Sequence, residues 1–290
     1  MLTASILIPV FNHEDFLPDL FKSLSINCND SHEILFCDDN SGDTSYNVCR
    51  ELLPQLKKKC AHVYLTKNNH NLGVVRNLDK LIREARADIL VPIASDDFFL
   101  ANGLDLRIES LLADPNKKLA FCDGQGVDMQ GRVIVPSLAA AGGFLPVDFS
   151  GDKIAQTFAL KWNPPLNLQS WRRNFFKVHG GEFEFDSSVF CEDLPYALAA
   201  GASGNVGFAS RPCVAYRCRS WPQISQGKKE ALWKDMGYLF GKYAFHYEKS
   251  DRTILRMAGE RFYLLSIGDV AGAQSKWIEI QKFAEDCKSK

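Results

Sequence analysis

Short apolar runs alternate with amphipathic segments over the first 97 residues of the chain. Four of the runs have the length and composition of strands, at residues 5–10, 33–37, 63–65 and 88–94. Three segments between them carry apolar residues at helical spacing, at residues 14–24, 48–56 and 74–85. Strands that are apolar on both faces and alternate with helices predict a mainly parallel central sheet covered by helices, an α/β architecture.

The alternation fades beyond residue 100, and from residue 228 the pattern is helical. In the middle part we expect helices at 104–112 and 193–200, and strands at 119–122 and 131–135. In the last part we expect helices through 232–247, 251–267 and 270–287. Pro222 and Gly227 interrupt the chain just before this part, so we place a domain boundary near residues 221–227.

Polar clusters follow three of the four predicted strands. They lie at residues 9–12, at Asp38 with Asp39, and at residues 95–97. In parallel α/β sheets, ligands bind beyond the carboxyl ends of the strands, where the strand order reverses. We therefore expect one edge of the sheet to gather four carboxylates.

The aspartates at 96 and 97 are the strongest candidates for chemistry. The chain has neither the GxGxxG turn nor the GxxxxGK[ST] loop that binds phosphates through backbone amides. Carboxylates at the end of a buried strand offer oxygen ligands to Mg²⁺ or Mn²⁺, which bridge such groups to substrate phosphates. The alternative is that Asp96 and Asp97 cap the next helix.

Composition and charge argue against two classes of protein. Lys and Arg total 34 against 35 Asp and Glu, so no general basic surface favours a nucleic-acid partner. The apolar runs fall far short of the roughly 18 to 20 residues that span a bilayer. Because residues 1–4 carry no charged region before the first apolar run, we also expect no secretory signal.

The nine cysteines are odd in number and form no CxxC pair, and the histidines show no metal-ligand spacing. A structural zinc site or a disulfide framework is therefore not expected. Free thiols packed as small apolar residues predict a reducing, cytoplasmic location.

Five motifs, in order along the chain, resemble the inverting family 2 glycosyltransferases of GT-A fold. They are SILIPVFN at 5–12, ILFCDDNSGD at 34–43, NLGVVRN at 71–77, ASDD at 94–97, and GGEF at 180–183 with CEDL at 191–194. The resemblance implies a catalytic domain over residues 1–220 and a helical region over 221–290. Within the catalytic domain it implies a nucleotide-binding half at 1–97 and an acceptor half at 98–220.

Carried over residue by residue, the resemblance implies a nucleotide site formed by Pro9, Phe11, Asn12, Asp38, Asp39, Arg76, Ser95 and Asp96. Residues 9, 11 and 12 would line the base, and Asp39, or Asp38, would accept a hydrogen bond from a uracil-type imide. Arg76 would lie near the base or the diphosphate. Asp96 would bind the ribose hydroxyls, and Asp97 would bind the divalent metal, Mg²⁺ or Mn²⁺. Ala94 stands where family members commonly have a further aspartate.

Glu192 and Asp193 match the catalytic base motif of the family, in which the aspartate takes the proton from the acceptor hydroxyl. An inverting transfer is a direct displacement at the anomeric carbon, which requires a carboxylate on the acceptor side and a cation on the leaving group. The alternative is that Asp193 caps the helix that follows. The segment with Arg211, Arg217 and Arg219 resembles the arginine-containing strand that follows the base helix in this family, where a cation could face phosphate, but solvent exposure is the default for each.

The resemblance thus implies a metal-dependent transferase that moves a sugar from a nucleotide-diphosphate donor, a UDP-sugar, to a hydroxyl of a glycan or lipid-linked acceptor. Surface polysaccharide biosynthesis is the expected context. The C-terminal helices are expected to pack against the catalytic domain or a second subunit, or to rest on the inner face of the membrane. Two alternatives remain: a sugar-nucleotide or polyprenol-phosphate transferase, and a nucleotide-sugar-binding module that has lost catalysis, which Ala94 favours.

Overall fold

A computed structural model describes residues 2–144, 153–161, 165–174, 189, 193–202, 204–218 and 229–288. The chain forms two compact units. The first consists of Met1–Ala139, Leu166–Ser187 and Gly207–Trp221, and the second of Ala140–Pro165, Ser188–Val206 and Pro222–Lys290. The last change from the first unit to the second lies between Trp221 and Pro222. However, two segments that we expected in the catalytic domain, 140–165 and 188–206, belong to the helical unit because their helices pack on its helices.

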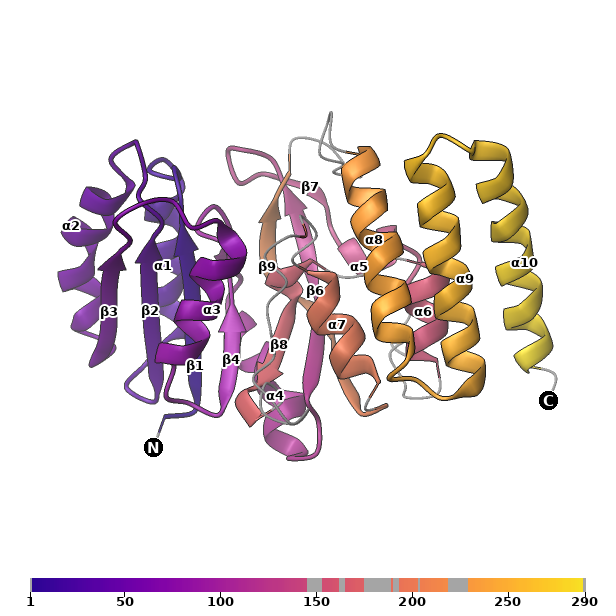
Figure 1. Cartoon of the computed structure of the whole chain (residues 1–290). Coiled ribbons are helices and arrows are strands. Elements are labelled where there is room, and N and C mark those ends of the chain that lie inside the picture. Colours follow the sequence, from indigo (N-terminus) through magenta and orange to yellow (C-terminus); the bar gives the residue numbers. More distant parts are fainter. Residues whose placement is uncertain are drawn as a thin grey trace. The chain divides into compact units, whose positions relative to one another are not determined.

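The first unit begins with the predicted succession of strands and helices. The strands are β1 (Ala4–Val10), β2 (His32–Asp38), β3 (His62–Lys67) and β4 (Ile89–Pro92), and the helices between them are α1 (Leu17–Asn27), α2 (Ser45–Lys57) and α3 (Val74–Glu84). The strands lie in the order β3, β2, β1, β4, and all their pairings are parallel, as predicted. Figure 1 shows the three helices beside these strands.

The sheet continues past β4 with antiparallel strands. Beyond β4 the order is β8 (Gln169–Arg172), β6 (Leu119–Val127), β9 (Val206–Arg217) and β5 (Phe98–Phe99), while β7 (Val133–Val135) pairs with β6. The remaining elements of this part are α4 (Gly103–Ala113), the 3₁₀ turn η2 (Leu166–Leu168) and α5 (Leu138–Ala141). The predicted parallel sheet is thus confirmed for the first four strands, and it extends into an antiparallel half.

Apolar side chains from both faces of the parallel strands form the core of the first unit. Ile6, Ile8 and Ile34 are fully buried, and the rings of Phe21 and Phe36 stack with centroids 4.8 Å apart. Pro9 lies past the end of the β1–β4 pairing, which stops at Leu7, and stays in register with Cys37 of β2. The cysteines of the described part are free thiols, and all but Cys287 are buried.

The second unit is helical in the part that the structure describes. It contains α6 (Ile154–Leu160), α7 (Leu194–Gly201), α8 (Lys229–Ala244), α9 (Lys249–Ser266) and α10 (Val270–Lys288). Helices α8, α9 and α10 lie side by side (Figure 1). Tyr243 and Tyr247 are buried, and the Tyr247 hydroxyl donates to the Leu198 carbonyl at 2.6 Å, so these two residues of the segment 232–247 pack inside the second unit. Among the described helices, none is both long and apolar enough to cross a bilayer.

Candidate functional site

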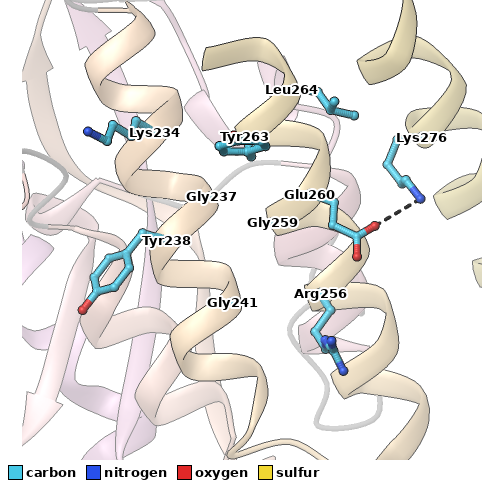
Figure 2. Close-up of a pocket in the computed structure, with 10 residues that line it drawn as sticks. All are labelled: Lys234, Gly237, Tyr238, Gly241, Arg256, Gly259, Glu260, Tyr263, Leu264 and Lys276. Atoms are coloured by element: carbon cyan, nitrogen blue, oxygen red, sulfur yellow. Dashed lines mark ion pairs between the residues drawn. The ribbon is translucent and has the colours of Figure 1, made fainter. Parts of the chain in front are cut away.

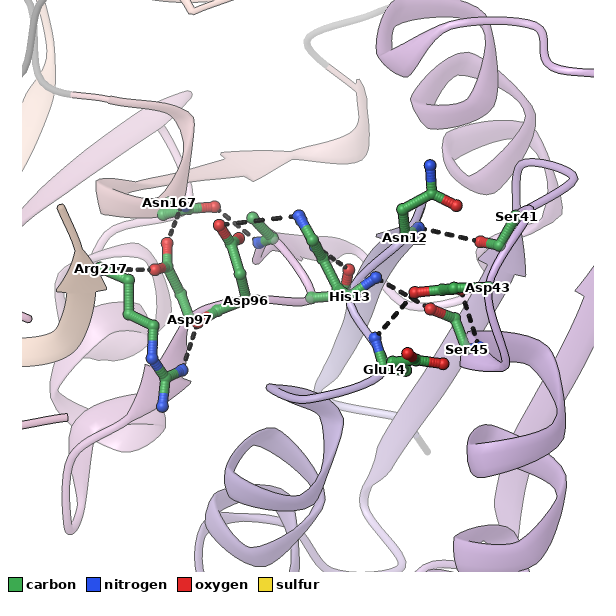
Figure 3. Close-up of polar contacts among 12 residues, drawn as sticks. Asn12, His13, Glu14, Ser41, Asp43, Ser45, Asp96, Asp97, Asn167 and Arg217 are labelled. Atoms are coloured by element: carbon green, nitrogen blue, oxygen red, sulfur yellow. Dashed lines mark hydrogen bonds and ion pairs between the residues drawn. The ribbon is translucent and has the colours of Figure 1, made fainter. Parts of the chain in front are cut away.

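The loop after β1 is tied to the loop after β2. Asn12 has a positive φ of 55°, a conformation that asparagine tolerates better than most residues. Its N–H donates to the Ser41 hydroxyl at 3.0 Å (Figure 3). Its side-chain Oδ1 accepts from the Gly42 N–H at 2.8 Å. Phe11, just before it, keeps 43% of its surface exposed. The two loops therefore form one polar platform with an exposed ring beside it.

Asp39 organises the loop before α3. Its carboxylate accepts from the Asn68 amide at 2.8 Å, from the Leu72 N–H at 2.9 Å and from the Gly73 N–H at 2.8 Å. Gly73 has a φ of 81°, which an L side chain rarely adopts. Arg76 follows in the first turn of α3 and is exposed. Asp39 is thus occupied by protein donors and is only 3% exposed, so its contacts fix the loop that carries Arg76 into solvent.

Asp38, the alternative to Asp39, is also buried. Its Oδ1 accepts from the Ser41 N–H at 3.1 Å and lies 3.8 Å from the Lys67 ammonium. Its Oδ2 has no hydrogen-bond partner among the described residues. Asp38 is fully buried and Asp39 is nearly so, so both carboxylates are directed into the protein and not toward solvent.

The two aspartates after β4 have different surroundings. The Asp96 side chain is 30% exposed, and its Oδ2 lies 3.8 Å from His13 Nε2. Asp97 is 1% exposed: one oxygen accepts from the Arg217 N–H at 2.7 Å and the other from the Asn167 amide. Figure 3 shows Asp96 directed toward His13, and Asp97 held between Asn167 and Arg217. The accessible carboxylate of the pair is therefore Asp96.

Burial raises the pKa of Asp97 well above its usual value, and the neighbouring Asp96 charge raises it further. The Arg217 N–H, the Arg217 charge and the Asn167 amide lower it in part. Two adjacent carboxylates thus repel each other at the end of a buried strand. A cation that binds there gains from this excess of negative charge.

The donor set at this position fits a cation that takes most of its ligands from substrate and water. Within the described residues, no group of three His, Cys, Asp or Glu side chains could hold a metal ion by itself. Mg²⁺ characteristically binds through one or two carboxylates plus substrate phosphates. The accessible Asp96 carboxylate can supply one such ligand, with the buried Asp97 charge behind it.

The predicted catalytic base lies in the second unit. Asp193 immediately precedes α7, which begins at Leu194, and it is half-buried. This position is compatible with both the base role and the cap. Glu192 lies outside the described residues, as do the GGEF motif and Cys191.

The family model described as Glycosyl transferase family 2 matches residues 5–170 of the chain. This match includes every predicted nucleotide-site residue and Asp97, and it covers more than half of the sequence. The chain belongs to glycosyltransferase family 2.

Two curated relatives carry glycosyltransferase names. An uncharacterized glycosyltransferase of Haemophilus influenzae is 27% identical over 130 residues, which is 43% of this chain and 50% of that protein. A processive diacylglycerol beta-glycosyltransferase of Mycoplasma genitalium is 32% identical over 96 residues, which is 33% of this chain and 28% of that protein. The chain therefore spans half the length of the first relative and less than a third of the second.

Solved structures with the same fold include two nucleotide-sugar complexes. S. aureus TarS 1–349 in complex with UDP-GlcNAc superposes with a TM-score of 0.65 at 13% identity, over 96% of this chain and 79% of that one. The mannosyltransferase PcManGT of Pyrobaculum calidifontis, in complex with GDP-Man and Mn²⁺, gives 0.62 at 14% identity, over 99% and 80%. These likenesses confirm the predicted GT-A fold.

Arg217 is one residue of this family 2 domain that sequence reasoning misplaced. We expected it at the surface by default, but it is 4% exposed. Its guanidinium donates to the Asp96 carbonyl and to Asp19, and it lies 4.9 Å and 5.1 Å from the ring centroids of Phe16 and Phe98. Because it joins β9 to α1 and to the backbone at Asp96, it positions the segment that carries Asp96 and Asp97.

Asn167 and His13 escaped the sequence analysis altogether. Asn167 Oδ1 accepts from the Ala94 N–H at 2.7 Å, and its amide holds Asp97. His13 Nδ1 lies 2.8 Å from the Ser95 hydroxyl. These contacts join residues 70 to 82 positions apart. His13 directly follows the motif at 5–12, whereas Asn167 lies beside none of the family motifs, so the sequence offered a signal for His13 alone.

The second unit has a groove of its own, of about 660 Å³, between α8 and α9. Gly237 and Gly259 allow the helices to cross closely: a Cβ on Gly259 would lie 3.0 Å from the Gly237 carbonyl oxygen. Figure 2 shows these glycines with Arg256, Tyr263 and the Glu260–Lys276 ion pair along the groove. None of the predicted site residues lines this groove.

Proposed function

We propose that this family 2 chain is a metal-dependent inverting glycosyltransferase that uses a nucleotide-diphosphate sugar, with a UDP-sugar as the donor. The observation that carries the proposal is the set of carboxylates and exposed polar groups at the carboxyl ends of β1, β2 and β4. The strands β1, β2 and β3 follow one another toward one edge of the sheet, and β4 lies on the other side of β1, so the strand order reverses between β1 and β4, which is where α/β sheets bind nucleotides.

The donor nucleotide is proposed to lie over the platform formed by the loops after β1 and β2. Phe11 offers an exposed ring for the base, beside Pro9 and Asn12. Arg76 faces the base or the diphosphate from the first turn of α3, which Asp39 holds in place through Leu72 and Gly73. In this proposal Asp39 and Asp38 hold the loops around the base in place from the buried side, through hydrogen bonds from Leu72, Gly73 and Ser41. Ser95 and Asp96 border the ribose.

A divalent cation, Mg²⁺ or Mn²⁺, would offset the charge of the diphosphate as it leaves. Asp96, which borders the ribose through Oδ2, would meet the cation with the other oxygen of its accessible carboxylate. Asp97, the ligand that we predicted, stands behind as a buried charge held by Asn167 and Arg217. The mannosyltransferase with Mn²⁺ supports metal dependence for this fold.

Asp193 is proposed to accept the proton of an acceptor hydroxyl. As that proton leaves, the hydroxyl oxygen bonds to the anomeric carbon and the bond from this carbon to the diphosphate oxygen breaks, which inverts the configuration. Glu192 is the second candidate for the base. The acceptor is proposed to be a glycan or lipid-linked hydroxyl in surface polysaccharide synthesis, on the cytoplasmic side. Peripheral membrane contact and association through the C-terminal helices stay predictions.

A thermal-shift screen of nucleotide sugars, with and without Mn²⁺, tests the proposal. We expect a UDP-sugar to raise the unfolding temperature of the full chain, and more so with Mn²⁺. Stabilisation by none of the nucleotide sugars would refute the donor site. Stabilisation together with no hydrolysis or transfer of the bound sugar would favour the binding module that Ala94 suggests.

A further inference from the structure

His13 and Asp96 face each other at the carboxyl ends of β1 and β4, the two strands between which the strand order reverses. The pairing of β1 with β4 ends at Leu7 and Pro92. His13 follows β1 and Asp96 follows β4, and in Figure 3 their side chains point toward each other. Nucleotides bind at this position in α/β sheets, so the pair borders the proposed donor site.

The orientation of the His13 ring is fixed by several contacts. The His13 N–H donates to the Ser45 hydroxyl at 2.8 Å, and its carbonyl accepts from the Phe16 N–H at 3.0 Å as α1 begins. The ring packs edge-on against Phe16, with centroids 5.9 Å apart. Nδ1 meets the buried Ser95 hydroxyl at 2.8 Å. These contacts leave Nε2 as the ring nitrogen that faces Asp96.

The space between Nε2 and the Asp96 carboxylate has the size of one hydroxyl group. The two atoms are 3.8 Å apart, too far for a direct hydrogen bond. A hydroxyl oxygen can lie about 2.8 Å from both, accepting from an N–H and donating to a carboxylate at once. Both side chains are 30% exposed, so a ligand can reach them.

We propose that His13 Nε2–H and Asp96 Oδ2 together bind one ribose hydroxyl of the donor nucleotide. The inference rests on the proposed function, to which it adds a residue that determines specificity for ribose. In this arrangement the Ser95 hydroxyl donates to Nδ1, and the proton of His13 is on Nε2. A phosphate has no proton to give Asp96 at neutral pH, whereas a ribose hydroxyl does. The ribose is also the part of the donor next to the base, and His13 directly follows Phe11 and Asn12.

Two substitutions separate ligand binding from a purely structural role. Glutamine carries its amide nitrogen at about the distance of Nε2, so His13→Gln keeps a donor toward the hydroxyl and gives up the Ser95 contact. Asparagine carries its amide at about the distance of Nδ1, so His13→Asn keeps the Ser95 contact and gives up the donor. His62→Asn, at the start of β3 and far along the strand from these loops, is the matched control.

The experiment is calorimetric titration of UDP, 2′-deoxy-UDP and 3′-deoxy-UDP into the full chain with Mn²⁺. We expect the natural chain to bind one deoxy analogue about 10- to 100-fold more weakly than UDP, because a charge-assisted hydrogen bond is lost. His13→Asn is expected to reduce that discrimination by about three- to tenfold, whereas His13→Gln and His62→Asn retain most of it.

Equal binding of UDP and both deoxy analogues by the natural chain would overturn the inference and leave the proposed function standing. Discrimination that survives in His13→Asn but is lost in His13→Gln would also overturn it, because the ring would then act only through Ser95. Failure of the natural chain to bind UDP would overturn the proposed function and this inference with it.

Discussion

The strand-end loops of the first unit and the helices of the second unit are held by different kinds of contact. In the loops, buried carboxylates accept backbone N–H groups, as Asp39 does from Leu72 and Gly73. In the helices, close packing at Gly237 and Gly259 brings two backbones together. A change in the loops should therefore alter ligand binding and stability together. A change in the helix contacts should alter stability alone.

Asp193 is the proposed exception, since it lies in the second unit but acts in the reaction. Asp193→Asn is expected to lower the transfer rate by about 10²- to 10⁴-fold, because the amide cannot take the proton. UDP affinity, measured by calorimetry, should stay unchanged. Glu192→Gln is the matched variant, and a near-normal rate for Asp193→Asn with a large loss for Glu192→Gln would reassign the base.

Asp39→Asn tests the carboxylate contacts of the loops. Asparagine places an amide hydrogen against an N–H donor, so we expect a loss of about 2 to 3 kcal/mol in the free energy of unfolding. UDP binding should weaken in the same variant. Asp79→Asn is the control, because its ion pair with Arg83 is partly exposed and contributes less than about 1 kcal/mol. Equal stability of the two variants in urea titrations would contradict the role of Asp39.

Gly259→Ala tests the helix packing. The new methyl group would lie 3.0 Å from the Gly237 carbonyl oxygen, so we expect a loss of about 1 to 3 kcal/mol in unfolding free energy. Gly241→Ala meets nothing within 4 Å and should gain up to about 1 kcal/mol from helix propensity. Both variants should bind UDP as the natural chain does, and a large loss of UDP affinity in either would break the comparison.

The smallest effect is expected from Glu33, at the opposite end of the strands from the site. Burial raises the pKa of Glu33, but hydrogen bonds from Ser5 and Arg86 and the Arg86 charge outweigh it, so the pKa lies below its ordinary value. The stabilisation is therefore present above the unfolded pKa of about 4.3 and is lost as the pH falls through the lower folded value. Glu33→Gln should lose less unfolding free energy than the natural chain between about pH 5 and pH 3 in urea titrations. An identical loss would exclude this carboxylate as a source of the acid sensitivity.

Local pattern was sufficient for the first four strands and their helices. The run at residues 5–10 and the strand Ala4–Val10 differ by one residue, because the strand is buried on both faces and its apolar pattern is continuous. The same pattern placed the carboxylates at one edge, since parallel strands bring their carboxyl ends together. The family motifs then identified the fold.

Contacts between distant segments could not be read in the same way. Arg217 is buried because Asp19, Phe16 and Phe98 surround it, and these residues are about 120 to 200 positions away. Helices α6 and α7 belong to the helical unit because they pack on α8 and α9, a choice that their short apolar sequences do not specify. The burial of Asp97 likewise depends on Asn167, 70 positions later.

The central claim is that Asp96, at the accessible end of β4, helps hold a cation that binds the donor diphosphate. Calorimetric titration of UDP with and without Mn²⁺ into the natural chain and into Asp96→Asn tests it most directly. We predict that Mn²⁺ tightens UDP binding at least tenfold in the natural chain and by less than about twofold in the variant. The same tightening in both proteins would contradict the account.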